Sequence, residues 1–182
     1  MAKAILISIK PKWVAKILNG EKTIEIRKTM PKCDFPIDVY IYCTKGNGIK
    51  DFITMYKHDL STDEIGGRYI NGTVVAKFTL NKVEEIKYHF GYYDMGEWTE
   101  SYILENSRLT NEELDNYFQA SKEYNEKVPS KVYGYAWHID NLFIFSEPKA
   151  LSEFATLVKS YKYHRVYDYL TCPPQSWCFV EI

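Results

Sequence analysis

The chain has 182 residues, which is enough for one domain with a core of its own but short for two full domains. Sixteen tyrosines, nine glycines, seven prolines and 26% charged residues exclude the collagenous, disordered and coiled-coil classes. The net charge of −1 combines +6 in residues 1–50, from ten Lys/Arg against four Asp/Glu, with −7 in residues 51–182, from thirteen against twenty. A basic region of this kind can attract a polyanion.

Several sequence features indicate a cellular compartment and argue against bound metal. No apolar run reaches the roughly 20 residues that a membrane span needs, and residues 1–10 are too short an apolar run for a signal peptide. We therefore expect a soluble, cytoplasmic protein without membrane attachment. The cysteines lack C-x-x-C spacing and the histidines lack an i, i+4 pair, so we expect no metal and no cofactor, with the thiols packed as small hydrophobes.

The first 86 residues read as short strands separated by short helices. Pro11 is suited to the first position of a helix of one to three turns, and Gly20 to the left-handed position that ends it. Alternation of apolar and polar residues, or short β-branched runs, predict the strands. We expect strands at residues 4–9, 23–27, 37–44 and 73–80, and a second helix at about 49–57.

Residues 88–130 differ in character from the flanking chain. Nine acidic against three basic residues, and a Thr110-x-x-Glu113 capping box ahead of an amphipathic pattern, predict an acidic helical insertion. Strand signals return at 132–145, followed by a short helix near 149–158 and a closing strand at 177–182. Together these elements predict an α+β fold, with a small, mixed, barrel-like sheet, flanking helices and the insertion, in a single domain of residues 1–182.

The segment that follows the first helix contains a G-x-K-x-x-E-x-R motif, through Gly20, Lys22, Glu25 and Arg27. This motif, placed after a strand and a helix, resembles the ASCH domain of the PUA-like superfamily. The segments YAWHI at 135–139 and PPQSWC at 173–178 resemble the longer bacterial and phage-associated members. The resemblance covers residues 4–86 and 132–182. It implies a PUA-like fold that binds RNA or a nucleobase, with a modified nucleoside as one candidate ligand.

The spacing within the motif gives a geometric expectation. Lys22 and Glu25 are three residues apart, so in a regular strand they would point to opposite faces. They can meet only if Lys22 lies in the turn before the strand, where Gly20 makes a tight bend cheap. Glu25 and Arg27 share a face. We therefore expect a carboxylate flanked by two cations on the wall of a cleft, although an exposed ion-pair ladder of little consequence gives the same spacing.

Such a cluster suits a base edge or a phosphate, because Arg offers a planar donor fork, Lys a point charge and Glu an acceptor. Aromatic rings would add stacking, although each ring taken singly is more often a core residue. Ser8, Lys10 and Lys12, at the exit of the first strand, are candidates for phosphate contacts. The predicted nucleic-acid-binding residues are Ser8, Lys10, Lys12, Trp13, Lys22, Glu25, Arg27, Tyr42, Trp137 and Trp177.

Two other functions remain open from the sequence. Some ASCH-like proteins are amidohydrolases that deacylate N4-acetylcytidine, with a catalytic Thr three residues after the motif lysine; here that position is Glu25, and Thr23 is adjacent to Lys22. A hydrolase of an N-acylated nucleoside or of RNA would use Lys22 and Glu25, with a later acid from Glu84 or Glu85. Alternatively, the acidic insertion at 88–130 binds a protein partner.

Overall fold

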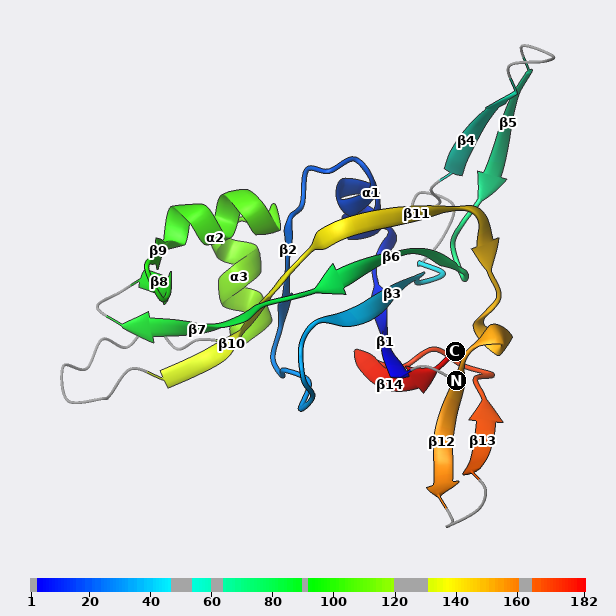
Figure 1. Cartoon of the computed structure of the whole chain (residues 1–182). Coiled ribbons are helices and arrows are strands. Elements are labelled where there is room, and N and C mark those ends of the chain that lie inside the picture. The colour runs from blue at the N-terminus through cyan, green and yellow to red at the C-terminus, as the bar shows by residue number, and fades with distance from the viewer. Residues whose placement is uncertain (1–2, 47–53, 60–63, 90–91, 120–130, 161–164) are drawn as a thin grey trace. The chain divides into compact units, whose positions relative to one another are not determined.

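The computed structural model describes residues 3–46, 54–59, 64–89, 92–119, 131–160 and 165–182 (Figure 1). The chain divides into two compact, discontinuous units. Unit 1 consists of residues 1–18, 37–78 and 141–182, and unit 2 of residues 19–36 and 79–140. The division does not test the expectation that residues 1–182 form one domain, which stays a prediction.

Unit 1 is built on a mixed sheet with the strand order β11-β6-β3-β1-β14-β12-β13. Its central strand β1 pairs in parallel with β3 and antiparallel with β14, where Lys3 lies opposite Glu181. A separate antiparallel pair joins β4 to β5. The elements are β1 (Lys3–Ile9), α1 (Pro11–Leu18), β3 (Ile37–Cys43), β4 (Thr54–Asp59), β5 (Glu64–Tyr69), β6 (Val74–Leu80), β11 (Asp140–Lys149), η2 (Leu151–Glu153), β12 (Ala155–Ser160), β13 (Arg165–Tyr169) and β14 (Trp177–Glu181), with β6 and β11 counted in the unit that holds most of their residues.

The central strands of unit 1 are nearly continuous apolar runs because both of their faces are buried in its core. Residues 4–7 of β1 are fully buried, as expected for a strand covered on both faces. Tyr40 packs against Phe154 and Phe145, with ring centroids 5.1 and 6.0 Å away. Helix α1 buries Pro11, Val14 and Ile17, so its apolar residues lie on one side.

Unit 2 is built on an antiparallel sheet with the order β2-β10-β7-β8-β9. Helices α2 and α3 pack their buried residues against one face of this sheet (Figure 1). Ile103 of α2 and Leu114 and Phe118 of α3 join Ile24 and Ile26 of β2 in one core cluster. The elements are β2 (Ile24–Arg27), β7 (Val83–His89), β8 (Tyr92–Met95), β9 (Trp98–Thr99), α2 (Glu100–Ser107), α3 (Asn111–Phe118) and β10 (Lys131–His138).

The α+β class is confirmed, and each expected strand is present, with the segment expected at 132–145 divided between β10 and β11. The Thr110–Glu113 capping box is also confirmed, because Thr110 Oγ1 accepts from Glu113 N and Glu113 Oε2 accepts from Thr110 N. The described strands form open sheets, with β11 and β13 at the edges of the larger one, and no closed barrel appears among them. The described part of the insertion contains both helices and the short strands β8 and β9.

Two helix predictions are wrong over the described residues. Thr54–Asp59 is strand β4, paired with β5, rather than the end of a helix at 49–57; residues 49–53 lie outside the described residues. The predicted helix near 149–158 is only the single turn η2, followed by β12. In both places pairing with the next strand of a hairpin, β5 for β4 and β13 for β12, outweighs the local pattern.

Gly134 lies at a bulge in β10, where this strand comes close to the Phe118 side chain of α3 and to the backbone of Arg27 in β2. A Cβ built at Gly134 would lie 2.4 Å from Phe118 Cε1 and 2.8 Å from the backbone oxygen of Arg27. We predict that Gly134→Ala lowers the free energy of unfolding by about 1–3 kcal/mol, because the backbone of β2 cannot move aside cheaply. Urea unfolding measures this loss.

Gly20→Ala is the matched control for this prediction. Gly20 has φ of +73° and no atom within 4 Å of a built Cβ, so only backbone strain of about 1 kcal/mol applies there. A loss at Gly134 smaller than the loss at Gly20 would contradict the packing argument.

Candidate functional site

The motif residues converge as the spacing predicted. Strand β2 begins at Ile24, so Lys22 lies before it, in the bend that Gly20 opens with φ of +73°. Lys22 Nζ lies 3.2 Å from Glu25 Oε2, and Arg27 Nη2 lies 3.1 Å from Glu25 Oε1. The side chains are 3%, 8% and 11% exposed respectively, so this is a buried ion cluster rather than a surface ladder. We call Lys22, Glu25 and Arg27 the motif cluster.

Trp137 of β10 joins the motif cluster by strand register. Trp137 lies directly opposite Glu25, and Tyr135 lies opposite Arg27, so these side chains extend from the same face of the sheet. Trp137 is fully buried. In the described conformation its ring is therefore a packing surface beside the cluster, not an open stacking platform.

The carboxyl end of α2 supplies a further partner for Lys22. Lys22 Nζ donates to the backbone oxygen of Ser107, the last residue of α2, at 2.8 Å. The carbonyl groups at a helix C-terminus carry partial negative charge and favour a cation there. The buried ammonium thus has both a carboxylate and a helix end to offset its desolvation.

Tyr117 of α3 contacts the other cation of the cluster. Its phenol is hydrogen-bonded to Arg27, and the Lys28 ammonium lies 5.4 Å from the centre of its ring. Burial raises the pKa of Tyr117, while the Arg27 charge and its hydrogen bond oppose that rise. The phenol is therefore neutral near pH 7, and it adds no negative charge to the motif cluster.

The motif cluster itself carries an excess positive charge. It holds two cations and one carboxylate, and both oxygens of that carboxylate are already engaged. A charge in a poorly solvated setting attracts a counterion more strongly than it would in water. The arrangement is therefore suited to an anionic or acceptor-rich group.

The remaining predicted residues belong to unit 1, where the start of α1 forms a basic and aromatic patch. The Lys12 and Lys16 ammonium groups lie 4.4 and 5.4 Å from the centre of the Trp13 ring, and Lys10 is exposed. Lys16 was not predicted, although its i, i+3 spacing from Trp13 on a helix is a usable signal. We call Lys10, Lys12, Trp13 and Lys16 the α1 patch.

Ser8, Tyr42 and Trp177 are held by contacts within unit 1. Ser8 Oγ donates to the Pro174 carbonyl at 2.7 Å, and the Tyr42 side chain is buried. Trp177 is half-buried and meets Phe179 edge to face, with centroids 5.6 Å apart. These contacts account for the positions of the three side chains. Their role in binding stays a prediction.

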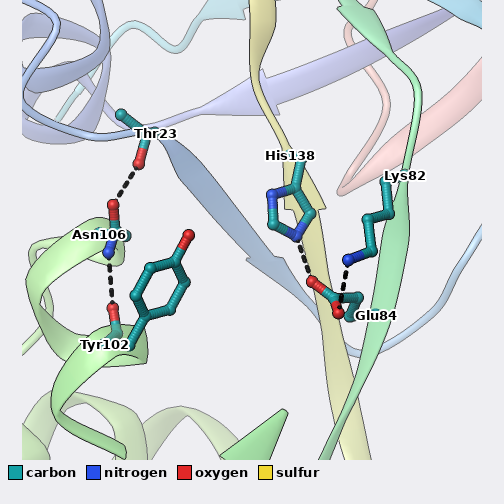
Figure 2. A network of polar contacts seen from close by, with 6 residues as sticks. All are labelled: Thr23, Lys82, Glu84, Tyr102, Asn106 and His138. Atoms are coloured by element: carbon teal, nitrogen blue, oxygen red, sulfur yellow. Dashed lines mark hydrogen bonds and ion pairs between the residues drawn. The ribbon is translucent and has the colours of Figure 1, made fainter. Parts of the chain in front are cut away.

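A second polar group in unit 2 joins Glu84, which the sequence suggested as a possible acid, to His138, which it did not. His138 Nε2 lies 2.6 Å from Glu84 Oε2, and Lys82 Nζ lies 2.8 Å from Glu84 Oε1 (Figure 2). Glu84 and His138 are 16% and 18% exposed, so solvent reaches both. His138 is 54 residues from its partner, and only the pairing of β7 with β10 brings them together. We call these two residues the Glu84–His138 pair.

Cys33, Cys43, Cys172 and Cys178 all lie within the described residues and form no disulfide, and Cys43 is buried. Burial raises the pKa of Cys43 to about 12, so its thiol is protonated and unreactive at neutral pH. No helix among the described residues is long and apolar enough to cross a membrane.

Comparisons with known proteins place the fold. No family model matches the sequence, and no curated protein matches it. The crystal structure of ASCH from Zymomonas mobilis is similar, with 14% identity and a TM-score of 0.53, over 98% of this chain and 87% of that chain. A crystal structure of a Tyr-to-Phe mutant of the same protein has 15% identity and a TM-score of 0.52, over 99% and 91% of the two chains. The chain therefore has the ASCH fold, as the motif resemblance implied.

The burial of the motif cluster generates a stability prediction. Glu25→Gln leaves two buried cations without their carboxylate, and we expect a loss of about 3–5 kcal/mol in the free energy of unfolding. Asp38→Asn is the matched control, because the Lys77–Asp38 pair is 34% and 38% exposed and should contribute about 1 kcal/mol or less. Equal losses in urea unfolding would contradict the assignment of a buried, interdependent cluster.

Proposed function

We propose that this protein binds single-stranded RNA or a nucleobase, and that the motif cluster is the centre of the site. The observation that carries the proposal is the excess positive charge of a buried cluster with one carboxylate for two cations. A phosphate or the acceptor edge of a base would offset that charge. The ASCH fold also supports the proposal, because the resemblance to that domain implies binding of RNA or a nucleobase.

The α1 patch of unit 1 supports the same function independently. A tryptophan ring accompanied by lysine ammonium groups combines stacking with phosphate neutralisation, the two contributions that single-strand binding uses. The positive balance of residues 1–50 adds a longer-range attraction for a polyanion. Binding should therefore weaken steeply as salt concentration rises.

We predict that Lys22→Ala and Arg27→Ala each weaken binding of single-stranded RNA by about tenfold to a hundredfold, because each removes a charge-assisted contact. Trp13→Ala should weaken it by a comparable factor through lost stacking. Fluorescence anisotropy titration at fixed salt measures the effect, and circular dichroism verifies that each variant is folded.

Lys149→Ala is the charge-matched control for this prediction. Lys149 forms a half-exposed ion pair with Glu153, so its removal lowers the net charge equally without touching the motif cluster. If folded Lys22 and Arg27 variants bind like the Lys149 variant, the proposed site is wrong.

Hydrolysis of an N-acylated nucleoside is a second candidate function, which the Glu84–His138 pair favours. A carboxylate can only accept, so Glu84 fixes the proton on His138 Nε2 and leaves Nδ1 as the basic nitrogen. Nδ1 would take a proton from a water molecule whose oxygen attacks the acyl carbon. When the C–N bond breaks, that proton passes to the departing amine, and the products are a carboxylic acid and the nucleoside amine.

The earlier assignment of Lys22 and Glu25 as catalytic residues stays a prediction. Both oxygens of Glu25 are engaged by cations, whereas the Glu84–His138 pair offers a nitrogen suited to proton transfer. Glu84, one of the two acids considered from the sequence, lies in that pair. Glu85 instead forms a half-exposed ion pair with Lys87.

We predict that His138→Asn and Glu84→Gln each lower any hydrolysis of N4-acetylcytidine by at least about a hundredfold, because general acid–base catalysis is lost. Glu85→Gln, the neighbouring control, should retain activity. Chromatographic detection of cytidine and acetate measures the reaction. Absence of product with the unmodified protein, across N-acylated nucleosides and single-stranded RNA, would remove the hydrolase candidate.

A further inference from the structure

The end of α2 is tied to the motif by a set of hydrogen bonds. Thr23 N donates to the Asn106 carbonyl at 2.9 Å, and Thr23 Oγ1 donates to Asn106 Oδ1 at 2.7 Å (Figure 2). Arg108 Nε donates to the Glu21 carbonyl at 2.9 Å. With the bond from Lys22 to Ser107, residues 106–108 contact every residue from 21 to 23. We call Asn106, Ser107 and Arg108 the α2 clasp.

Two features show that the clasp is fixed in place. Asn106 Nδ2 donates to the Tyr102 carbonyl at 3.0 Å, which orients the side-chain oxygen toward Thr23 (Figure 2). Arg108 has φ of +57°, a left-handed conformation that glycine or asparagine usually occupies at a helix end. A non-glycine residue persists there only when the surrounding contacts favour it, and its side-chain bond to Glu21 is one such contact.

The clasp acts on the residue whose position is hardest to maintain. Lys22 precedes β2, so no strand pairing holds its backbone, and burying a lysine side chain forfeits much rotamer freedom. The clasp supplies a backbone bond to Thr23 on one side, a bond to Glu21 on the other, and a carbonyl for Nζ itself.

From these contacts we infer that the α2 clasp is a positioning element for Lys22, so that the acidic helical insertion forms part of the ligand site. The inference rests on the proposed RNA-binding function of the motif cluster. It opposes the alternative in which residues 88–130 serve only as a separate surface for a protein partner. Asn106 and Arg108 hold the bend without themselves contacting the ligand.

Deleting the insertion cannot test this idea, because Ile103, Leu114 and Phe118 are part of the core of unit 2. Thr23→Val is the sharper change, since it removes only the hydroxyl bond to Asn106. We expect it to weaken single-stranded RNA binding by about fivefold to thirtyfold, with Asn106→Ala similar and Thr23→Ser close to the unmodified protein. Thr73→Val, which loses an equivalent 2.7 Å bond to Ile70 in unit 1, should bind normally.

A double-mutant cycle separates positioning from general destabilisation. If the clasp acts through Lys22, Thr23→Val should have little further effect on RNA binding once Lys22→Ala is present. Full additivity of the two changes would overturn the inference. If Lys22→Ala alone leaves binding unchanged, the proposed function fails instead.

A measurement that does not involve RNA distinguishes failure of the positioning inference from failure of the proposed RNA-binding function. The Lys22 ammonium is buried and hydrogen-bonded, so its protons should exchange slowly enough to be observed by nitrogen-15 NMR. Thr23→Val and Asn106→Ala should accelerate that exchange, whereas Thr73→Val should not. Unchanged exchange in both clasp variants would show that the clasp does not hold Lys22, whatever the RNA titration gives.

Discussion

The organisation of unit 2 depends on one carboxylate, Glu25, shared between two cations inside the protein. A buried ion pair offsets its desolvation only when the geometry is good and the remaining donors find partners. Three parts of the chain provide this geometry. The bend at Gly20 places Lys22 beside Glu25, the Ser107 carbonyl at the end of α2 accepts a hydrogen bond from Lys22, and Tyr117 of α3 contacts Arg27. The helices of the insertion therefore complete an electrostatic arrangement that begins in β2.

This arrangement separates two kinds of chemistry within the same unit. The motif cluster has surplus positive charge and no carboxylate oxygen left over, which favours holding an anion over moving a proton. The Glu84–His138 pair has the opposite character, because it joins a carboxylate to an imidazole, a combination suited to proton transfer, and solvent reaches both side chains. Binding and catalysis, if both occur, would thus rely on different side chains, and variants of one group would leave the chemistry of the other intact.

Local sequence signals predicted the parts of the fold that depend on neighbouring residues. The bend at Gly20, the meeting of Lys22 with Glu25 and the Thr110 capping box all span eight residues or fewer, and all are confirmed. The α+β class and the ASCH fold followed from element order and one short motif.

The remainder depends on contacts between distant segments, which a single sequence does not reveal. Lys22 and Ser107 are 85 residues apart, and His138 and Glu84 are 54 apart. Strand β4 is a different case: its partner β5 begins at Glu64, shortly after Asp59, and pairing within this hairpin rather than the pattern of β4 alone determines its conformation. Burial of the motif cluster also depends on distant segments, since the spacing alone fits an exposed ladder equally well.

The pairing of β1 with β14, in which residue 3 lies opposite residue 181, also bears on biosynthesis. While the ribosome is still translating, β1 has an apolar strand edge without its partner, and unpaired edges of this kind invite aggregation. Unit 1 can close only after β14 has been synthesised, so until then β1 should benefit from chaperones that shield nascent chains.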